Sequence, residues 1–276
     1  MGPFSFIKHL KEIVLSRPEV SASAADNTLL KILYNRRSIR KFTPKEIPDD
    51  VMAAILEAGR LAPCTVNLQT WSFFIFTPEE WKKCIGNPIP FKGNRAVLVC
   101  GDINRVKPVL KNMPDCPLFE YTTAVINASL ASMNMNLAAE ALGVSSIMLS
   151  ETGKTGYFYA DYLQKKLDLP NGVFPLLTLV LGYAKGGYPA MPPKFASEYV
   201  TFKNKYKKTP MEVTSDWFDK MTAGYKFTFP LKTFKGQLKT YNEHLVDAEE
   251  ALKKMVFHYG SSAPEKRDSK GKMKRP

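Results

Sequence analysis

Residues 62–71, Ala62-Pro63-Cys64-Thr65-Val66-Asn67-Leu68-Gln69-Thr70-Trp71, join two segments of different hydrophobic periodicity and therefore decide how the chain folds. Upstream, after Pro48, apolar side chains recur at the spacing of a helix. Pro63 ends that helix, because the residue before a proline avoids the helical conformation. Downstream, residues 71–77 are rich in aromatic side chains, which is typical of strands. The stretch between them is predicted to form a loop that leads from a helix into a strand.

Helices and strands alternate on both sides of this loop. Helices are expected over residues 27–37, 49–62, 122–142, 158–167 and 235–257, and strands over residues 71–77, 96–101, 145–149 and 173–183. The helix at 122–142 is apolar nearly all round and rich in alanine, so several of its faces are expected to be buried. Gly143 is well placed to end it in a left-handed conformation. This alternation indicates a layered α/β or α+β domain.

Composition limits the class of protein. The chain has 276 residues, 45% of them hydrophobic, which is enough for a substantial core in one or two domains. Its longest nearly apolar run, residues 174–184, is about half of the ~20 residues that a membrane-spanning helix requires. Residues 1–10 show no apolar stretch followed by a cleavage site. We therefore expect no membrane partner and a cytoplasmic location.

Cysteine spacing and glycine motifs exclude several kinds of site. Cys64, Cys84, Cys100 and Cys116 lie 16 to 20 residues apart, which suits neither a zinc site nor an iron–sulfur cluster. We expect reduced thiols and no metal. The chain has no G-x-G-x-x-G motif after a strand and no G-x-x-x-x-G-K-[ST] motif. An ordinary dinucleotide-binding Rossmann unit and a phosphate-loop nucleotidase are therefore not expected.

The formal charge of +13 is unevenly distributed. Residues 201–276 hold 17 Lys and Arg against nine Asp and Glu. Such a surplus is either a solvated surface or an attraction for phosphates, nucleic acid or anionic lipid, and we favour the solvated surface.

Two segments carry side chains suited to binding a phosphorylated heterocycle. In an extended chain alternate residues face one side, so Arg36, Ser38 and Arg40 could converge on a phosphate or a ring carbonyl. Asn67 and Gln69 carry carboxamides that both donate and accept, which matches the imide edge of a flavin pyrimidine ring. The structural alternatives are an arginine cluster that caps a helix and an asparagine that serves a turn.

The order of these segments resembles that of the FMN-binding nitroreductases over residues 28–200. The similar segments are Arg36-Arg37-Ser38-Ile39-Arg40, the loop 62–71, Ala138-Ala139-Glu140-Ala141-Leu142-Gly143-Val144 and Val180-Leu181-Gly182-Tyr183. The resemblance implies an α+β fold of three layers, α/β/α, with a central, mostly antiparallel sheet. It also implies an intertwined homodimer with FMN between the subunits and the helix 122–142 in the interface, where we expect Ala131.

Cofactor contacts follow from the resemblance residue by residue. It implies that FMN contacts Arg36, Arg37, Ser38, Arg40, Pro63, Cys64, Thr65, Asn67, Gln69, the backbone near Ser150 and Glu151, and Lys194. Three substitutions depart from the common family pattern, namely Cys64 for Ser, Thr70 for Pro and Ala184 for Pro. Many relatives also place a Glu-Gly pair beside the reacting ring nitrogen, whereas residues 149–153 here read Leu-Ser-Glu-Thr-Gly.

The function that the resemblance implies is an FMN-dependent NAD(P)H oxidoreductase passing two electrons to a small oxidised acceptor such as a nitroaromatic or a quinone. No catalytic side chain is expected beyond an electrostatic role for Arg40. Reductive dehalogenation, flavin fragmentation and heterocycle dehydrogenation on the same scaffold stay open. So does a flavin or nucleic-acid binding protein without turnover, although nucleic acid is not the partner we expect.

We expect four parts of the chain. These are an N-terminal arm at 1–27, the FMN-binding domain at 28–200, a C-terminal extension packed on the core at 201–260, and a disordered basic tail at 261–276. The aromatic residues of the extension supply too much apolar area for a disordered segment. The extension is either a lid over the flavin or packing without contact to the site.

Overall fold

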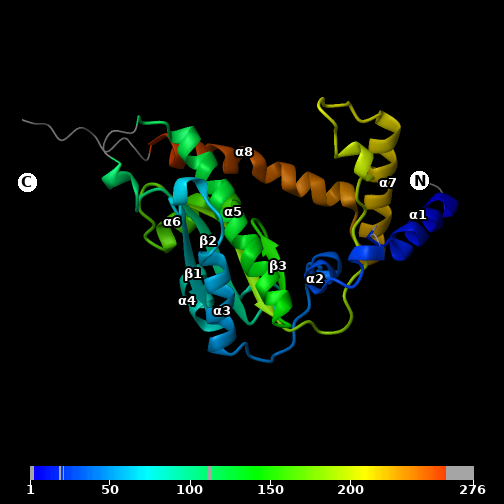
Figure 1. Cartoon of the computed structure of the whole chain (residues 1–276), viewed down its shortest axis with the longest axis horizontal. Helices are drawn as coiled ribbons and strands as arrows, with labels where there is room; N and C mark the ends of the chain where they lie inside the picture. Colours follow the sequence, from blue (N-terminus) through cyan, green and yellow to red (C-terminus); the bar gives the residue numbers. More distant parts are fainter. Residues whose placement is uncertain (1–2, 19, 21, 111–113, 259–276) are drawn as a thin grey trace, which may run out of the picture. The chain divides into compact units, whose positions relative to one another are not determined.

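The computed structural model describes residues 3–18, 20, 22–110 and 114–258. The chain divides into two compact units, residues 1–37 with 188–244 and residues 38–187 with 245–276. The sheet and the loop at 62–71 belong to the second unit (Figure 1). The predicted tail at 261–276 lies outside the described residues, and the predicted domain borders at 28 and 200 stay a prediction.

A four-stranded antiparallel sheet forms the centre of the second unit. Its strands are β1 (Trp71–Phe76), β2 (Arg95–Asp102), β3 (Ser145–Leu149) and β4 (Val173–Gly182), in the order β1-β2-β4-β3. Trp71 pairs with Gly101, so the loop at 62–71 enters the sheet at the end of β2. The pairing of β2 with β4 shifts register between Val99 and Cys100.

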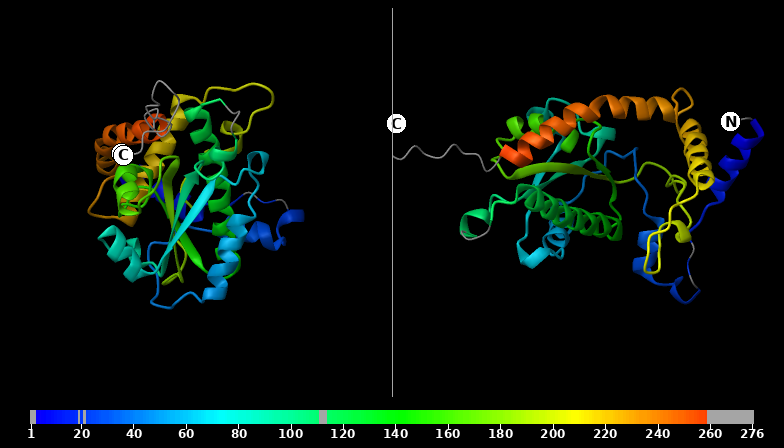
Figure 2. Two further views of the ribbon diagram at one scale, coloured as in Figure 1. Left: turned by 90° about the vertical axis from the view of Figure 1, so that its left-hand side faces the viewer. Right: turned by 90° about the horizontal axis from the view of Figure 1, so that it is seen from above.

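Helices cover both faces of this sheet (Figure 2). They are α3 (Asp49–Arg60), α4 (Pro78–Ile85), α5 (Pro117–Ala141) and α6 (Ala160–Lys166). Along β2, Val97 and Val99 pack into the core shared with α3 and α5, whereas Leu98 packs into the core shared with α4 and α6. Alternate residues of a strand point to opposite faces, so the two cores are the two sides of one sheet. The predicted three-layer α/β/α arrangement is confirmed.

The first unit is helical. It holds α1 (Pro3–Leu15), α2 (Thr28–Asn35), α7 (Met211–Thr228) and the start of α8 (Phe234–His258). Helix α1 packs on α7, and a Cβ at Gly224 would stand only 3.2 Å from Ile13 Cδ1. The Lys220 ammonium joins the two helices through an ion pair of 3.1 Å with Glu12. The far end of α8 belongs to the second unit, where Met255 and Val256 lie in the core.

Most predicted elements are present near their expected limits. The strand at 145–149 has the predicted bounds, and Gly143 adopts the left-handed conformation with φ of +73°. Helix α5 begins at Pro117, five residues earlier than expected. Helices α1, α4 and α7 were not predicted from the sequence. Helix α4 has a capping box between Thr77 and Glu80, which is a local signal, whereas α1 and α7 are defined by packing on each other.

Two further predictions concern the cysteines and membrane-spanning helices. All four cysteines are free thiols, as predicted, and burial raises the pKa of Cys100. Within the described residues no helix is long and apolar enough to cross a membrane.

Candidate functional site

The loop that follows α3 has an unusual backbone. Val66, Asn67 and Gln69 have positive φ angles of 49°, 54° and 50°. Residues other than glycine adopt this conformation only where the surrounding structure holds them, and such strain is often found at binding sites. Asn67 and Gln69 are exposed, although the Asn67 Oδ1 lies 3.9 Å from Cys64 Sγ and the Gln69 Nε2 lies 3.5 Å from the Asn67 carbonyl oxygen, while Thr70, next in the chain, is fully buried. The loop therefore presents two carboxamides outward from a firmly anchored base.

Asn127 of α5 anchors this loop at both ends. Its Oδ1 accepts hydrogen bonds from the Thr65 N–H at 3.1 Å and from the Thr65 hydroxyl at 3.3 Å. Its Nδ2 donates to the Thr70 hydroxyl at 2.8 Å. Because Asn127 is 1% exposed, each of these bonds replaces water that the polar groups would otherwise need. One buried side chain thus spans the loop from residue 65 to residue 70.

Two departures from the family pattern have structural roles in the loop. Proline at position 70 would lack the hydroxyl that accepts from Asn127, so Thr70 is needed for this anchor. The Thr70 carbonyl also accepts from the Asp102 N–H at 3.1 Å. Cys64 is half-buried, and its Sγ accepts from the Gln69 N–H at 3.4 Å. The thiol therefore helps to hold the loop closed.

Ser38 and Arg40 lie on the segment that runs beside β3. Ser38 forms a parallel bridge with Ser146, and the Ile39 N–H donates to the Ser146 carbonyl at 2.9 Å. The Ser146 hydroxyl in turn donates to Asn136 Oδ1 of α5 at 2.7 Å. Arg40 is exposed, and its Nη1 lies 3.4 Å from the Ser38 carbonyl oxygen. This segment places a hydroxyl and a guanidinium at the edge of the sheet.

Arg36, Arg37 and Lys194 belong to the first unit. Arg37 follows the end of α2, where its Nη1 donates to the carbonyls of Tyr34 at 2.7 Å and Arg36 at 2.8 Å. Burial, with the nearby charges of Arg36 and Arg17, lowers the pKa of Arg37. Arg37 thus caps the end of α2, and its predicted contact with the cofactor stays a prediction. The convergence of Arg36 with Ser38 and Arg40 stays a prediction, as does the role of exposed Lys194.

Ser150 and Glu151 come directly after β3. The Ser150 carbonyl accepts from the Phe158 N–H at 3.4 Å, and the Glu151 carbonyl accepts from the Lys154 N–H at 3.1 Å. A Cβ on Gly156 would stand 2.9 Å from the Ser150 Cα, so glycine is required there for close approach. These contacts fix the turn whose backbone was predicted to face the cofactor.

Helix α5 shows how far apart the parts of the predicted site lie within one chain. Asn127 holds the loop and Asn136 holds the Ser38 segment through Ser146. At 1.5 Å per residue these anchors are about 14 Å apart along the helix. Ser150 lies four residues beyond Ser146, about 13 Å along the strand direction. One chain therefore presents the predicted contacts as separate clusters along α5 and β3.

Neither Asn127 nor Asn136 was predicted from the sequence to belong to the site. The available signal was an asparagine in a helix expected to be buried nearly all round, because a buried amide must find hydrogen-bond partners. Ala131 was expected in a subunit interface, and that prediction is wrong. It has 0% exposure and packs in the chain's own core beside Ala128 and Met135.

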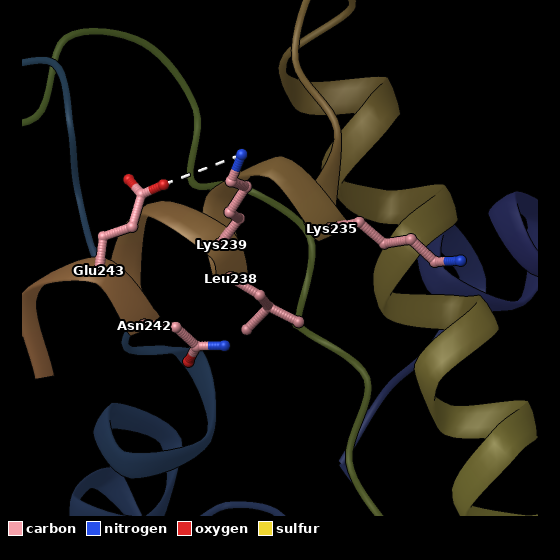
Figure 3. A pocket seen from close by; sticks show the side chains of 5 residues that line it. All are labelled: Lys235, Leu238, Lys239, Asn242 and Glu243. Carbon is pink, nitrogen blue, oxygen red and sulfur yellow. Dashed lines mark ion pairs between the residues drawn. The ribbon is translucent and has the colours of Figure 1, made fainter.

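A separate hollow lies along α8 in the first unit (Figure 3). Its volume is about 440 Å³, and all of its lining residues, from Lys235 to Glu243, come from one helix. Lys239 and Glu243 form an ion pair of 3.9 Å there. Side chains of a single helix face cannot enclose a ligand, so we do not regard this hollow as the functional site.

Sequence comparisons give a consistent set of relatives. A family model described as the Nitroreductase family matches residues 33–105. A protein of Archaeoglobus fulgidus, provisionally named NADH dehydrogenase/NAD(P)H nitroreductase, is 31% identical over 161 residues, which cover 56% of this chain and 85% of that protein. An FMN reductase [NAD(P)H] of Bacillus subtilis is 26% identical over 253 residues, covering 84% of this chain and 98% of that protein.

Solved structures share the fold at lower sequence identity. NfrA2 of B. megaterium superposes with a TM-score of 0.70 at 19% identity, covering 83% of this chain and 98% of that one. The NADPH:FMN oxidoreductase of Vibrio harveyi, solved in complex with NAD+, gives a TM-score of 0.66 at 20% identity. The match covers 82% of this chain and 97% of that one.

Replacement of Asn127 by leucine should loosen the loop. It leaves the Thr65 N–H and the Thr70 hydroxyl without their partner, so we expect a loss of about 1–3 kcal/mol in unfolding free energy and faster amide exchange at Thr65. Urea denaturation and hydrogen exchange measure the two effects. Asn134→Leu is the matched control, because Asn134 makes one bond to the Ala58 carbonyl, away from the loop. Equal Thr65 exchange in both variants would show that Asn127 does not anchor the loop.

Proposed function

Because this chain belongs to the nitroreductase family, we propose that it is an FMN-dependent oxidoreductase that takes electrons from NAD(P)H and passes them to a small oxidised acceptor. The observation that carries the proposal is the anchored loop at residues 63–70, whose exposed carboxamides stand where the family motif predicts cofactor contacts. The names of the A. fulgidus and B. subtilis relatives support the same reaction class.

The residues present fit FMN chemically. Asn67 and Gln69 offer donors and acceptors for the imide edge of the ring, and both are exposed on a loop of defined backbone. Ser38 and Arg40 add a hydroxyl and a guanidinium suited to phosphate or a ring carbonyl. Pro63, Cys64 and Thr65 complete the proposed flavin-lining loop. The backbone near Ser150 and Glu151, together with Arg36 and Lys194, remains part of the proposed contact set.

Bound FMN supplies the acceptance and release of hydride in such an enzyme. The protein's own contribution is position and electrostatics. Arg40 carries a permanent positive charge, and beside the pyrimidine edge it would favour negative charge that develops there. The Asn127 anchor holds the ends of the loop that carries the two carboxamides, so binding does not require the loop backbone to become ordered.

We further propose a homodimer in which a second copy of the chain covers α5. One face of this helix is in the core, whereas the opposite face carries the exposed apolar side chains of Ile126, Leu130 and Met133. Their spacing of three, four and seven residues forms a single stripe. A second subunit would both cover this stripe and bring its own cofactor-binding clusters near those of the first, which are spread along α5.

The purified protein should be yellow and contain about one FMN per chain. Anaerobic addition of NADH or NADPH should bleach the flavin absorbance near 450 nm, roughly where oxidised flavins absorb, and a nitroaromatic or a quinone should restore it. Absorbance spectroscopy measures both steps. A colourless protein that fails to bind added FMN would contradict the proposed function.

Loss of Arg40 should weaken FMN binding. Arg40→Ala removes a charge-assisted contact, for which we expect a decrease in affinity of roughly ten- to 100-fold. Flavin fluorescence titration gives the dissociation constant. Arg60→Ala serves as the control, because Arg60 is an exposed arginine paired with Glu57 at 2.6 Å on α3. If both variants bind FMN like the wild type, Arg40 is not a cofactor contact.

Two neighbouring substitutions on α5 separate the interface from the core. Leu130 is 41% exposed, so Leu130→Glu should leave the chain folded but shift the dimer to monomer. Ala131 is fully buried, so Ala131→Glu should unfold or aggregate the protein instead. Light scattering and circular dichroism distinguish the outcomes. A folded Leu130→Glu variant that stays dimeric would place the interface elsewhere.

A further inference from the structure

A cavity of about 200 Å³ lies next to the anchored loop in the second unit. Three segments line it: the loop itself, the turn that follows β2, and the first turns of α5. Its apolar lining consists of Leu68, Ile103, Val106, Leu110 and Phe119. Side chains from three separate segments meet in this cavity, whereas a single helix lines the hollow along α8.

The two charged groups that line this cavity, Lys107 and Glu120, pair with each other. Lys107 Nζ lies 3.2 Å from Glu120 Oε2, and it also lies 2.8 Å from Oδ1 of Asp115, an exposed side chain outside the cavity lining. Burial acts to lower the pKa of Lys107, but its hydrogen bonds with Asp115 and Glu120 outweigh burial and the pKa is raised. Lys107 therefore stays an ammonium, and within the cavity lining its charge is matched by that of Glu120. A charged ligand would lose its hydration without gaining an opposite charge of its own, so the cavity favours a neutral one.

The volume of the cavity and the hydroxyl group of Thr123 further define the class of ligand that fits. Apolar cavities of about 150 Å³ lined by aliphatic and aromatic side chains bind benzene, so 200 Å³ accommodates about one substituted ring. Thr123 also lines the cavity, and its hydroxyl makes no hydrogen bond within the part of the chain that the structure describes. This hydroxyl can pair with a hydroxyl or carbonyl group on the ring.

We propose that this cavity is a binding site for a neutral, single-ring aromatic molecule that carries a hydroxyl or carbonyl group. The site is separate from the proposed flavin contacts. Leu68 is half-buried and lines the cavity, whereas Asn67 and Gln69 on either side of it are exposed. A ligand in the cavity would contact the loop through Leu68 alone. Binding of this ligand does not depend on the proposed function.

The test uses 4-fluorophenol as the probe and fluorine NMR titration of the full chain without nicotinamide. Val106→Phe fills the cavity and should weaken binding at least about tenfold. Val109→Phe is the matched control, because Val109 lies on the same turn, is 75% exposed and does not line the cavity. It should bind like the wild type. Absence of binding to the wild type, or equal affinity in the Val106→Phe variant, would overturn the proposal.

A second variant tests the polar part of the site. Thr123→Val keeps the shape of the side chain and removes the hydroxyl, so we expect affinity to fall about three- to tenfold. Unchanged affinity would overturn the role of Thr123.

FMN content, read by absorbance in the same samples, keeps this proposal distinct from the proposed function. One-for-one displacement of FMN by 4-fluorophenol would overturn the separate site. A protein that binds 4-fluorophenol as expected but never binds FMN would support the cavity site and contradict the proposed function alone.

Discussion

Close packing of helix α5 against the sheet sets the geometry of the second unit. A Cβ on Gly101 of β2 would stand 3.0 Å from the Cβ of Ala124, and a Cβ on Gly59 of α3 would stand 2.6 Å from Met135 Cγ. Such distances require glycine opposite small or flexible side chains, since protein interiors tolerate little overpacking. The alanine-rich sequence of α5 thus lets one helix touch both the sheet and α3. The positions of the loop at 62–71 and of the Ser38 segment, which α5 anchors, depend on this close packing.

The same helix organises the candidate site. Its buried face is mainly small and apolar, yet it includes Asn127 and Asn136, whose amides would be costly to bury without partners. One amide bonds to the loop residues Thr65 and Thr70, and the oxygen of the other accepts from Ser146 beside the Ser38 segment. Burial therefore turns two polar side chains into anchors. Because the anchors are about 14 Å apart along α5, a single helix distributes the proposed contacts rather than gathering them.

Positively charged residues are unevenly distributed between the two units. Residues 1–37 and 188–244 hold 16 Lys and Arg against eight Asp and Glu, whereas residues 38–187 and 245–258 hold 17 against 16. Residues 38–187 and 245–258 are thus nearly neutral, and the chain's large positive charge belongs mainly to the helical unit and to residues 259–276.

Local patterns were sufficient to predict the four strands, helices α3 and α5, and the loop between α3 and β1. Proline, glycine and hydrophobic periodicity act over a few residues, so they are readable in the sequence. Only the tertiary structure decided that Thr70 is an anchor, that Ala131 lies in the core, and that Arg37 caps α2. Each depends on partners or exposure, and the Thr65 to Asn127 contact joins residues 62 positions apart. A hydrophobic pattern states which face of an element is buried, but packing selects what that face meets.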